Sequence, residues 1–452
     1  MDASNDTIFA PASAPGRAGV AVFRISGPKA QTVIARLCQP TTPPQPRKAS
    51  LRRLHHPDSG ETIDQTLVIY FPAPRSFTGE DVVELHTHGG HAVTTAVAEA
   101  LRRLPDFRLA EPGEFSRRAF ENGRMDLTEA EAIADLVDAE TEAQRRQALR
   151  QMEGALRQLY DSWRERLTQA LAWIEASIDF ADDELPTDVE RAPLRIAREL
   201  TQEIALHLND NHRGERLREG FSIAILGPPN AGKSSLLNAL AKREAAIVSP
   251  TPGTTRDIIE VHLNLGGYPV ILADTAGLRE SADSVENEGV RRALKHATQA
   301  DLKLLVFDGA EWPRLDATTQ QEINCNDKGL LAIINKSDLL EAAATTCAPR
   351  ATLPLLPVSA KTGQGLANLT QRLISLIEEH AGNSGPPPLT RERHRAALES
   401  CLSHLQRSLV ANESSLRAED LRLAMRDLGR ITGRVNVEDL LDIIFRDFCL
   451  GK

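Results

Sequence analysis

A glycine-rich octapeptide constrains the fold of this chain more than any other segment. Residues 227–234 read G-P-P-N-A-G-K-S and follow the apolar run Phe221–Leu226, which is typical of a buried strand. A helix is expected to begin at once, over Ser234–Leu240. In such a strand–turn–helix unit the backbone N–H groups can surround nucleotide phosphates, Lys233 can reach the β- and γ-phosphate oxygens, and the Ser234 hydroxyl can hold Mg²⁺. The segment therefore predicts a nucleotide-binding α/β domain.

Two further segments supply the groups that respond to the γ-phosphate. Residues 274–277 (D-T-A-G) follow the apolar run Val270–Ala273, so Asp274 can reach Mg²⁺ through water and Gly277 can approach the γ-phosphate. Upstream, residues 253–257 (G-T-T-R-D) supply hydroxyls on a loop that γ-phosphate and Mg²⁺ would order. The order of these segments along the chain is the one that a GTPase requires.

The choice of base is predicted from two later segments. Residues 335–338 (N-K-S-D) close the apolar run Leu330–Ile334, and the Asp338 carboxylate can accept from both N1–H and the 2-amino group of guanine. Adenine offers neither donor, and a buried polar group left unpaired by the wrong base is costly. Residues 359–361 (S-A-K) would complete the base pocket through backbone N–H groups. We therefore expect GTP binding and hydrolysis.

Composition favours a soluble intracellular protein. The 452 residues are enough for two to four domains, and no apolar stretch is long enough to span a bilayer. The first ten residues do not resemble a signal peptide, and five widely spaced cysteines suggest neither a disulfide framework nor a zinc site. The net charge of 53 − 63 = −10 argues against a surface covered in nucleic-acid-binding groups, although a local basic patch is compatible with it.

Four stretches are distinguished by their patterns. Residues 1–124 alternate strand-like and helix-like runs, an α+β pattern. Residues 125–219 are predicted to be helical, and the nucleotide domain is expected over 220–380. A Gly- and Pro-rich linker then leads into a second helical part, 381–452, in which Leu398, Leu402, Leu405 and Leu409 recur on one face.

The individual elements expected in the first two stretches are as follows. Strands are predicted over Val20–Ile25, Thr66–Phe71 and Val82–His86, and helices over Ala30–Leu37 and Ala92–Leu104. Between Asp126 and Asp179 the chain has almost no Gly or Pro. Apolar residues recur there at steps of three and four, from Leu149 to Ile178, which predicts a helix that buries one face.

Two helical parts on either side of a nucleotide domain suggest one bundle into which that domain is inserted. Each part presents an apolar stripe that needs a partner, and compact domains tolerate insertion where their chain ends lie close together. Two separate small bundles are the alternative. We favour the single bundle, so the predicted fold class is a P-loop GTPase domain inserted in a helical bundle and preceded by an α+β domain.

Because of these residues, the chain resembles one family from end to end, the tRNA wobble-uridine modification GTPases called MnmE or TrmE. The GTPase segments fit, and motifs outside them make the resemblance specific. These motifs are Pro15–Gly27 (P-G-R-A-G-V followed by R-I-S-G), Phe77–Asp81, His88–Gly90, Ala110–Ser116, Asp126–Ala132 and the terminal Phe448–Lys452 (F-C-L-G-K).

The resemblance implies a cytoplasmic homodimer, formed through the N-terminal domain, that works with a flavin-dependent partner, MnmG (GidA). Together they would add an aminomethyl-type (carboxymethylaminomethyl) group to C5 of the wobble uridine of certain tRNAs. The family's N-terminal domain holds a one-carbon tetrahydrofolate, and the matched positions are Arg24, Glu84, Arg124 and Lys452. The family commonly has lysine where this chain has Arg124, which keeps the charge but changes its geometry.

The resemblance also assigns the nucleotide site residue by residue. Ser234 and Thr255 would bind Mg²⁺. The residues expected to contact GTP are Asn230, Ala231, Gly232, Lys233, Ser234, Ser235, Ser249, Thr254, Thr255, Asp274, Thr275, Ala276, Gly277, Asn335, Lys336, Asp338, Ser359, Ala360 and Lys361.

Hydrolysis needs a group that orients water. Many small GTPases place a glutamine directly after D-x-x-G, but here that residue is Leu278, which can neither donate nor accept. In the family a glutamate of the second switch does this work, and the matched residue is Glu286. From chemistry alone, the favoured interpretation of Glu286 is a solvated glutamate at the start of a helix, where it complements the helix dipole.

A monovalent cation would supply the charge that an arginine finger supplies elsewhere. The resemblance implies K⁺ held by Asn230 together with oxygens at positions matching Ser249, Thr251 and Thr254. An asparagine in this loop is also compatible with a purely conformational role, because asparagine tolerates left-handed backbone geometry. Arg256 and Arg279 are alternative fingers, which we rank below the cation.

Two further interpretations stay open. Cys449 is a candidate nucleophile, since neighbouring Arg446 and Lys452 would favour its thiolate, but chemistry alone favours a buried apolar cysteine beside Phe445 and Phe448. The whole chain can alternatively be a folate-dependent enzyme that its GTPase domain only regulates, or a ribosome-assembly GTPase that switches RNA binding. The ribosome-assembly alternative predicts a basic C-terminal RNA module, whereas the tail is expected to be helical and its charges nearly cancel.

Overall fold

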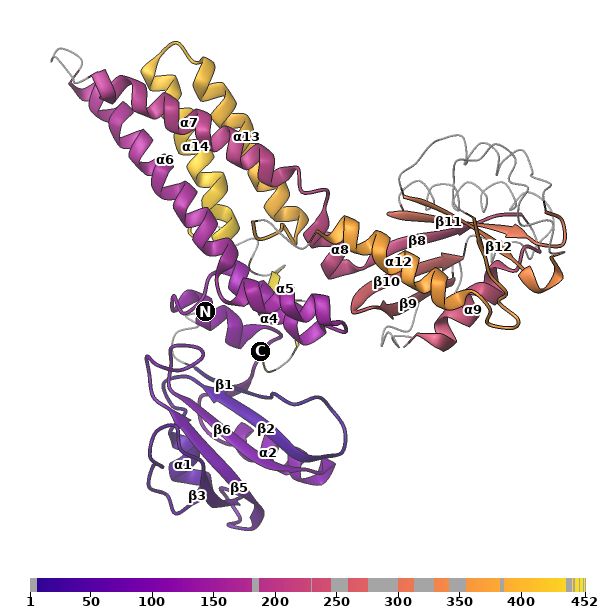
Figure 1. The fold of residues 1–452 in the computed structure, drawn as a ribbon. Coiled ribbons are helices and arrows are strands. Elements are labelled where there is room, and N and C mark those ends of the chain that lie inside the picture. The colour runs from indigo at the N-terminus through magenta and orange to yellow at the C-terminus, as the bar shows by residue number, and fades with distance from the viewer. Residues whose placement is uncertain are drawn as a thin grey trace, which may run out of the picture. The chain divides into compact units, whose positions relative to one another are not determined.

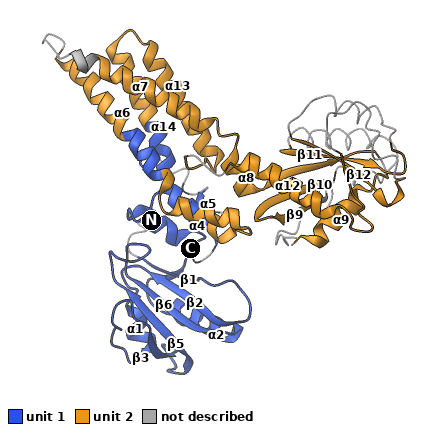
Figure 2. Ribbon diagram, in the orientation of Figure 1, with its two compact units in different colours: residues 1–134, 157–164, 426–452 blue, residues 135–156, 165–425 orange. Residues whose placement is uncertain are grey.

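The computed structural model describes residues 6–180, 187–228, 230–244, 259–274, 300–312, 329–340, 355–382, 386–435, 441, 444–446, 448, 449 and 451. For residues 187–190, 259 and 274 it describes the backbone alone. The chain divides into two compact units, the first made of residues 1–134, 157–164 and 426–452 and the second of residues 135–156 and 165–425 (Figure 2).

A mixed sheet forms most of the first unit. Its order is β3-β4-β5-β6-β2-β1-β7, and neighbouring strands are antiparallel except for β1 and β7, which are parallel. The strands are β1 (Thr7–Pro11), β2 (Ala18–Ser26), β3 (Cys38–Gln39), β4 (Ser50–His55), β5 (Thr62–Phe71), β6 (Val82–Gly89) and β7 (Phe107–Leu109). The predicted strands in β2, β5 and β6 are confirmed.

Helices α1 (Thr32–Leu37) and α2 (His91–Arg102) cover one face of this sheet and share a core with it (Figure 1). Both helices were predicted, with ends that differ by one or two residues. Because side chains alternate along a strand, Val83 and Leu85 of β6 enter this core and Glu84 lies on the opposite face. Arg24 pairs in register with Glu84 across β2 and β6. Both side chains therefore lie on the face that α1 and α2 leave uncovered.

The described residues near the end of the chain lie in the first unit beside α3 (Glu114–Glu121) and α4 (Leu127–Asp138). Phe445 and Phe448 contact each other and share an apolar cluster with Leu127. Gly113 makes this approach possible, since a Cβ atom there would lie 2.6 Å from the Phe445 carbonyl oxygen.

The prediction of one long helix between Asp126 and Asp179 is wrong in one respect. The structure has three helices there, α4, α5 (Glu142–Met152) and α6 (Ala155–Asp179). Thr141 and Gln144 form a capping box that starts α5. Gly154, with φ of 82°, separates α5 from α6. The apolar period continues across this break, so periodicity alone did not reveal it.

Helices α6, α7 (Thr187–Leu208), α13 (Glu392–Val410) and α14 (Ser414–Thr432) run alongside one another (Figure 1). Arg166 of α6 pairs with Glu199 and Glu203 of α7, and α7 packs along α13. Leu398 and Leu405 are fully buried on α13. Helices from both sides of the nucleotide domain thus share one bundle, which confirms the predicted fold class. The exact domain boundaries remain predictions.

A six-stranded sheet of order β13-β12-β11-β8-β10-β9 organises the nucleotide domain, with only β9 antiparallel to its neighbour among the described strands. Its core includes α9 (Lys233–Arg243) and α12 (Leu366–Ala381). The strands are β8 (Phe221–Leu226), β9 (Ile259–Leu265), β10 (Tyr268–Asp274), β11 (Leu302–Asp308), β12 (Leu330–Asn335) and β13 (Leu355–Pro357). The carboxyl ends of β8, β11 and β12 meet at one edge, where α/β sheets bind ligands.

Within the described part of the chain, no helix has the length and apolar character needed to cross a bilayer.

Candidate functional site

The phosphate-binding loop takes up the backbone geometry that its sequence predicts. Gly227, Asn230 and Gly232 have positive φ angles of 144°, 64° and 84°. A Cβ atom at Gly227 would overlap the Val306 carbonyl oxygen of β11, so only glycine fits there. Gly232 caps α9, and the loop therefore directs backbone N–H groups and a helix N-terminus at one place.

Lys233 and Ser234 occupy the first turn of α9 and face different surroundings. The Lys233 ammonium is buried and donates to the carbonyl oxygens of Gly227 and Pro228 at 2.8 and 2.7 Å. It thus lies within the curve of the loop, where a phosphate would compete for it. Ser234 and Ser235 are exposed at the start of the same helix, so their hydroxyls are accessible to a ligand. The position of Ser234 fits the oxygen ligand that Mg²⁺ requires.

Asn335 connects three of the predicted segments. Its side chain is 2% exposed and lies at the end of β12. Its Nδ2 donates to the Ala231 carbonyl oxygen at 2.8 Å, and its Oδ1 accepts from the Ala360 N–H at 3.1 Å. A buried amide with both ends satisfied holds its neighbours in a fixed register. The phosphate-binding loop, residues 335–338 and residues 359–361 therefore form one site.

Asp338 and Ser359 lie together at this site. Ser359 Oγ is fully buried and donates to Asp338 Oδ1 at 2.6 Å. This hydrogen bond lowers the pKa of Asp338 below its usual value, and Lys361 adds a smaller effect in the same direction. Asp338 follows Lys336, whose φ of 59° turns the chain. The carboxylate is thus kept ionised as an acceptor, which the guanine donors require.

Asp308 joins the site although the sequence analysis did not select it. It ends β11 directly beside Asn335 in the parallel pairing of β11 with β12, and its Oδ2 lies 2.6 Å from Lys336 Nζ. An acidic residue at the carboxyl end of an apolar strand was the signal that would have identified it.

Several expected site residues lie outside the described residues, so the structure leaves their roles as predictions. Asp274 ends β10, but its side chain is not described. The others are Ser249, Thr251, Thr254, Thr255, Thr275, Ala276, Gly277, Glu286 and Lys452.

The first unit brings together two of the predicted folate-binding residues. Arg24 Nε and Nη2 both lie 3.2 Å from Glu84 Oε1, and His86 Nε2 lies 3.3 Å from Glu84 Oε2. The Arg24 guanidinium carbon is 5.0 Å from the centre of the Phe77 ring and 5.9 Å from that of Phe115. A partly exposed ion pair is thus flanked by aromatic rings.

Arg124 reaches the same region through the Phe77–Asp81 loop. A Cβ atom at Gly79 would lie 3.2 Å from Arg124 Cγ, so the Arg124 side chain packs against this loop. From the other end of the chain, the Gly451 carbonyl oxygen lies 3.5 Å from Arg24 Nη1. Gly451 therefore contacts the arginine of the ion pair.

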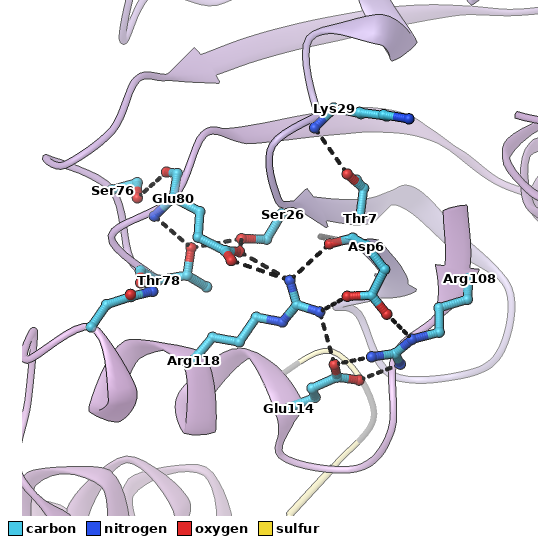
Figure 3. A network of polar contacts seen from close by, with 11 residues as sticks. Asp6, Thr7, Ser26, Lys29, Ser76, Thr78, Glu80, Arg108, Glu114 and Arg118 are labelled. Carbon is cyan, nitrogen blue, oxygen red and sulfur yellow. Dashed lines mark hydrogen bonds and ion pairs between the residues drawn. The ribbon is translucent and has the colours of Figure 1, made fainter. Parts of the chain in front are cut away.

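A network of charged side chains supports this loop (Figure 3). Arg118 donates to Glu80, Asp6 and Glu114, and Glu80 accepts from Ser26 at 2.6 Å. Arg118 is 6% exposed, so its charge needs these carboxylates. Burial opposes its ionisation, but the surrounding carboxylates raise the pKa of Arg118 overall. The network fixes residues 76–80 against β2 and α3.

Cys449 is a free, exposed cysteine, although its neighbours Phe445 and Phe448 are buried. The alternative interpretation as a buried apolar cysteine is therefore wrong. Its exposure leaves the thiol accessible, and its role as a nucleophile stays a prediction. His86 and His88 pair with Glu84 and Asp64 respectively.

Comparison with known families and proteins decides the family of the chain. Residues 7–124 match the family model of the GTP-binding protein TrmE N-terminus, and residues 127–449 match that of the MnmE helical domain. The chain belongs to the MnmE family. It is 54% identical over 448 residues to a tRNA modification GTPase MnmE of Paramagnetospirillum magneticum, covering 99% of this chain and 100% of that relative.

Other MnmE relatives are similar over the same length. A tRNA modification GTPase MnmE of Rhodospirillum rubrum is 52% identical over 99% of both chains. A mouse (Mus musculus) protein named as the mitochondrial 5-taurinomethyluridine-tRNA synthase subunit GTPB3 is 47% identical, over 99% of this chain and 94% of that protein. The resemblance on which the predictions rest is thus confirmed, and this MnmE-family chain is a GTPase.

Proposed function

We propose that this chain hydrolyses GTP as one component of a complex that adds a carboxymethylaminomethyl-type group to C5 of the wobble uridine of certain tRNAs. The observation that carries the proposal is the position of Asn335, which joins the phosphate-binding loop to both base-pocket segments. It occurs in a chain that matches MnmE-family models on both sides of the nucleotide domain.

The names of the relatives support the tRNA part of this proposal. The bacterial relatives are named tRNA modification GTPases, and the mouse relative is named as a subunit of a uridine-modifying synthase. We infer that this chain forms a homodimer in the cytoplasm. We also infer that the homodimer acts together with a second protein, a flavin-dependent MnmG (GidA) partner.

A one-carbon tetrahydrofolate is the proposed co-substrate, bound near Arg24 and Glu84. The chemistry of these residues fits: a guanidinium suits the carboxylates of a folate, and a carboxylate suits the adjacent N–H donors of a pterin. Phe77 and Phe115 flank the ion pair and provide flat apolar surfaces for a heteroaromatic ring. Arg124 and Lys452 complete the proposed set.

The metal ions of the proposed reaction act at the phosphate-binding loop. Mg²⁺ would be held by Ser234 and Thr255, where it neutralises charge on the phosphates. K⁺ would be held by Asn230, Ser249, Thr251 and Thr254. Glu286 is proposed to orient the attacking water, and Cys449 to serve the modification chemistry.

Nucleoside analysis of tRNA from a deletion strain tests the proposal. The C5-modified wobble nucleoside should disappear and return with the wild-type gene, but not with Lys233→Ala, which removes the ammonium inside the phosphate-binding loop. Lys242→Ala, an exposed lysine of the same helix, is the matched control and should restore it. Unchanged wobble nucleosides together with accumulating ribosomal RNA precursors would instead support the ribosome-assembly alternative.

A further inference from the structure

Asp308 makes two separate sets of contacts at the edge of the nucleotide sheet. Its side chain is buried at the end of β11, with 8% of its surface exposed. Oδ2 accepts from Lys336 Nζ at 2.6 Å, and Oδ1 accepts from the Ala310 N–H at 2.9 Å. One oxygen therefore holds a side chain of the base-pocket segment, while the other holds the turn that follows β11.

We propose that Asp308 is a positioning residue for base recognition, which holds the Lys336 ammonium away from Asp338 and leaves that carboxylate for guanine. The inference rests on the proposed role of residues 335–338 in guanine binding. In this proposal Asp308 contacts Lys336 and not the base. It acts through Lys336, whose position decides what surrounds the base.

The charges explain why such a residue is needed. Lys336 stands two residues before Asp338, on a backbone turn with φ of 59°, and its side chain is about one third exposed at 35%. Asp338 receives a hydrogen bond from Ser359 on one oxygen, at 2.6 Å. An unrestrained ammonium nearby would compete with guanine for the remaining acceptor sites of that carboxylate. Because Asp308 is the more buried carboxylate, its pair with Lys336 is less screened by water than a pair with Asp338 would be.

The contact with the turn is a purely structural alternative. The Glu311 and Trp312 N–H groups donate to the Asp308 carbonyl oxygen, and Ala310 donates to Oδ1. Asp308→Asn separates the two roles. Its amide oxygen can still accept from Ala310, but the change removes the negative charge that pairs with Lys336.

A double-mutant cycle measures whether Asp308 acts through Lys336. The variants are Asp308→Asn, Lys336→Met and both together, and the measurement is the dissociation constant for GDP at fixed salt. Methionine keeps an unbranched stem and removes the charge together with the N–H donors of the ammonium. Asp308→Asn should weaken GDP binding about 10-fold in the wild-type background and less than about 2-fold in the Lys336→Met background, since the partner charge is then already absent.

Inosine diphosphate provides a readout that a structural role would not move. It lacks the 2-amino group, one of the two donors expected to reach Asp338, so the wild-type protein should prefer GDP. Asp308→Asn should reduce this preference, because Lys336 then occupies the same carboxylate. Glu311→Gln, which neutralises an exposed carboxylate three residues away, should leave both dissociation constants unchanged.

Equal losses of GDP affinity in the two backgrounds would overturn the inference, as would an unchanged preference for GDP over inosine diphosphate. If Asp308→Asn does not fold, Lys336→Arg and Lys336→Met carry the test. Arginine can still pair with Asp308, and methionine removes the ammonium that would compete for Asp338, so both variants should stay within about 3-fold of the wild type; a larger loss in Lys336→Met would overturn the inference. Failure of the wild-type protein to bind GDP would instead overturn the proposed function.

Discussion

The Arg216 guanidinium on α8 (Arg213–Glu219) lies 2.6 Å from the Asp301 carboxylate, one residue before β11 begins. The other oxygen of Asp301 accepts from the Ser222 N–H of β8 at 2.8 Å. One side chain thus attaches α8 to two neighbouring strands of the nucleotide sheet. Residues 275–299, which include Glu286, lie just before Asp301 in the sequence.

Asp301→Asn should lower the free energy of unfolding by about 1–2 kcal/mol, because the amide keeps the bond from Ser222 but leaves Arg216 without its carboxylate. Arg218→Met is the control, since Arg218 pairs with the exposed Glu219 and such surface pairs contribute about 0–1 kcal/mol. Denaturant unfolding checks both variants. Equal losses in the two would show that the Arg216–Asp301 pair is an ordinary surface contact.

Local sequence signals predicted the elements of the nucleotide site. Residues 227–234 define a loop in which a Cβ atom at Gly227 would meet the Val306 backbone and one at Gly232 the Asn335 side chain. The apolar runs before Asn335 and Asp274 became β12 and β10. These features depend on residues adjacent in the chain, so a single sequence can reveal them.

Contacts between distant residues were harder to predict. At Gly154 the helix is interrupted, but the spacing of apolar residues continues without a change, so the sequence pattern did not reveal the break. The Asp308–Lys336 pair joins the last residue of β11 to the residue that follows β12, and nothing in either local sequence indicates the other. Cys449 stands beside two buried phenylalanines, yet its own exposure depends on how the chain end packs against Gly113.

The Ser359–Asp338 hydrogen bond leads to a prediction about base choice. Asp338→Asn should shift preference from GTP toward xanthosine triphosphate, because the acid accepts from the base whereas the amide can donate to the additional carbonyl of xanthine. Competition between the two nucleotides, measured as dissociation constants, checks the shift. If both proteins discriminate guanine equally, Asp338 is not the base-reading residue.

Asp126 should make stability depend on pH in the first unit. Burial raises the pKa of Asp126 to about 6, against hydrogen bonds from the Glu129 N–H and Thr128 that lower it. Among the described residues, its Oδ2 is buried without a hydrogen-bond partner. The folded state therefore retains the proton to higher pH than the unfolded state. As pH rises from about 4 to about 6, Asp126 ionises more readily in the unfolded state than in the folded state. The free energy of unfolding therefore falls by about 3 kcal/mol at most.

Asp126→Asn resembles the protonated acid and should flatten this dependence, because the amide oxygen can still accept from Thr128 and Glu129. Denaturant midpoints between pH 4 and 7 check the change. Asp138→Asn, at the exposed end of α4, is the control and should keep the wild-type profile. A variant whose stability falls as steeply as that of the wild type would assign the dependence to other groups.

Glu286→Ala tests the predicted water-positioning residue. Since Leu278 can neither donate nor accept, loss of Glu286 should lower kcat at least about 10-fold with little loss of GTP affinity. The change would affect the transition state rather than the ground state. Single-turnover hydrolysis and nucleotide titration separate the two, and unchanged turnover would make Glu286 a solvated helix residue.

Asn230 carries the prediction about the monovalent cation. Its φ of 64° lets it form the phosphate-binding loop, and its side-chain oxygen is a candidate K⁺ ligand. Hydrolysis should be much faster in K⁺ than in Na⁺ at equal ionic strength, because the larger cation fits a cage of phosphate and protein oxygens while screening is the same for both salts. Asn230→Ala should abolish this difference.

Two controls separate ligand loss from other effects of the substitution. Asn230→Gly relieves the strain of a positive φ and still lacks the ligand, so it should also lose the K⁺ preference. Asn238→Ala alters an exposed asparagine of α9 and should keep the K⁺ preference.

Because the predicted switch residues Ser249, Thr251 and Thr254 supply other oxygens, the cation should also order the loop that contains them and promote contact between the nucleotide domains of a dimer. Equal wild-type turnover in the two salts would mean that an arginine, such as Arg256 or Arg279, or another group supplies the charge.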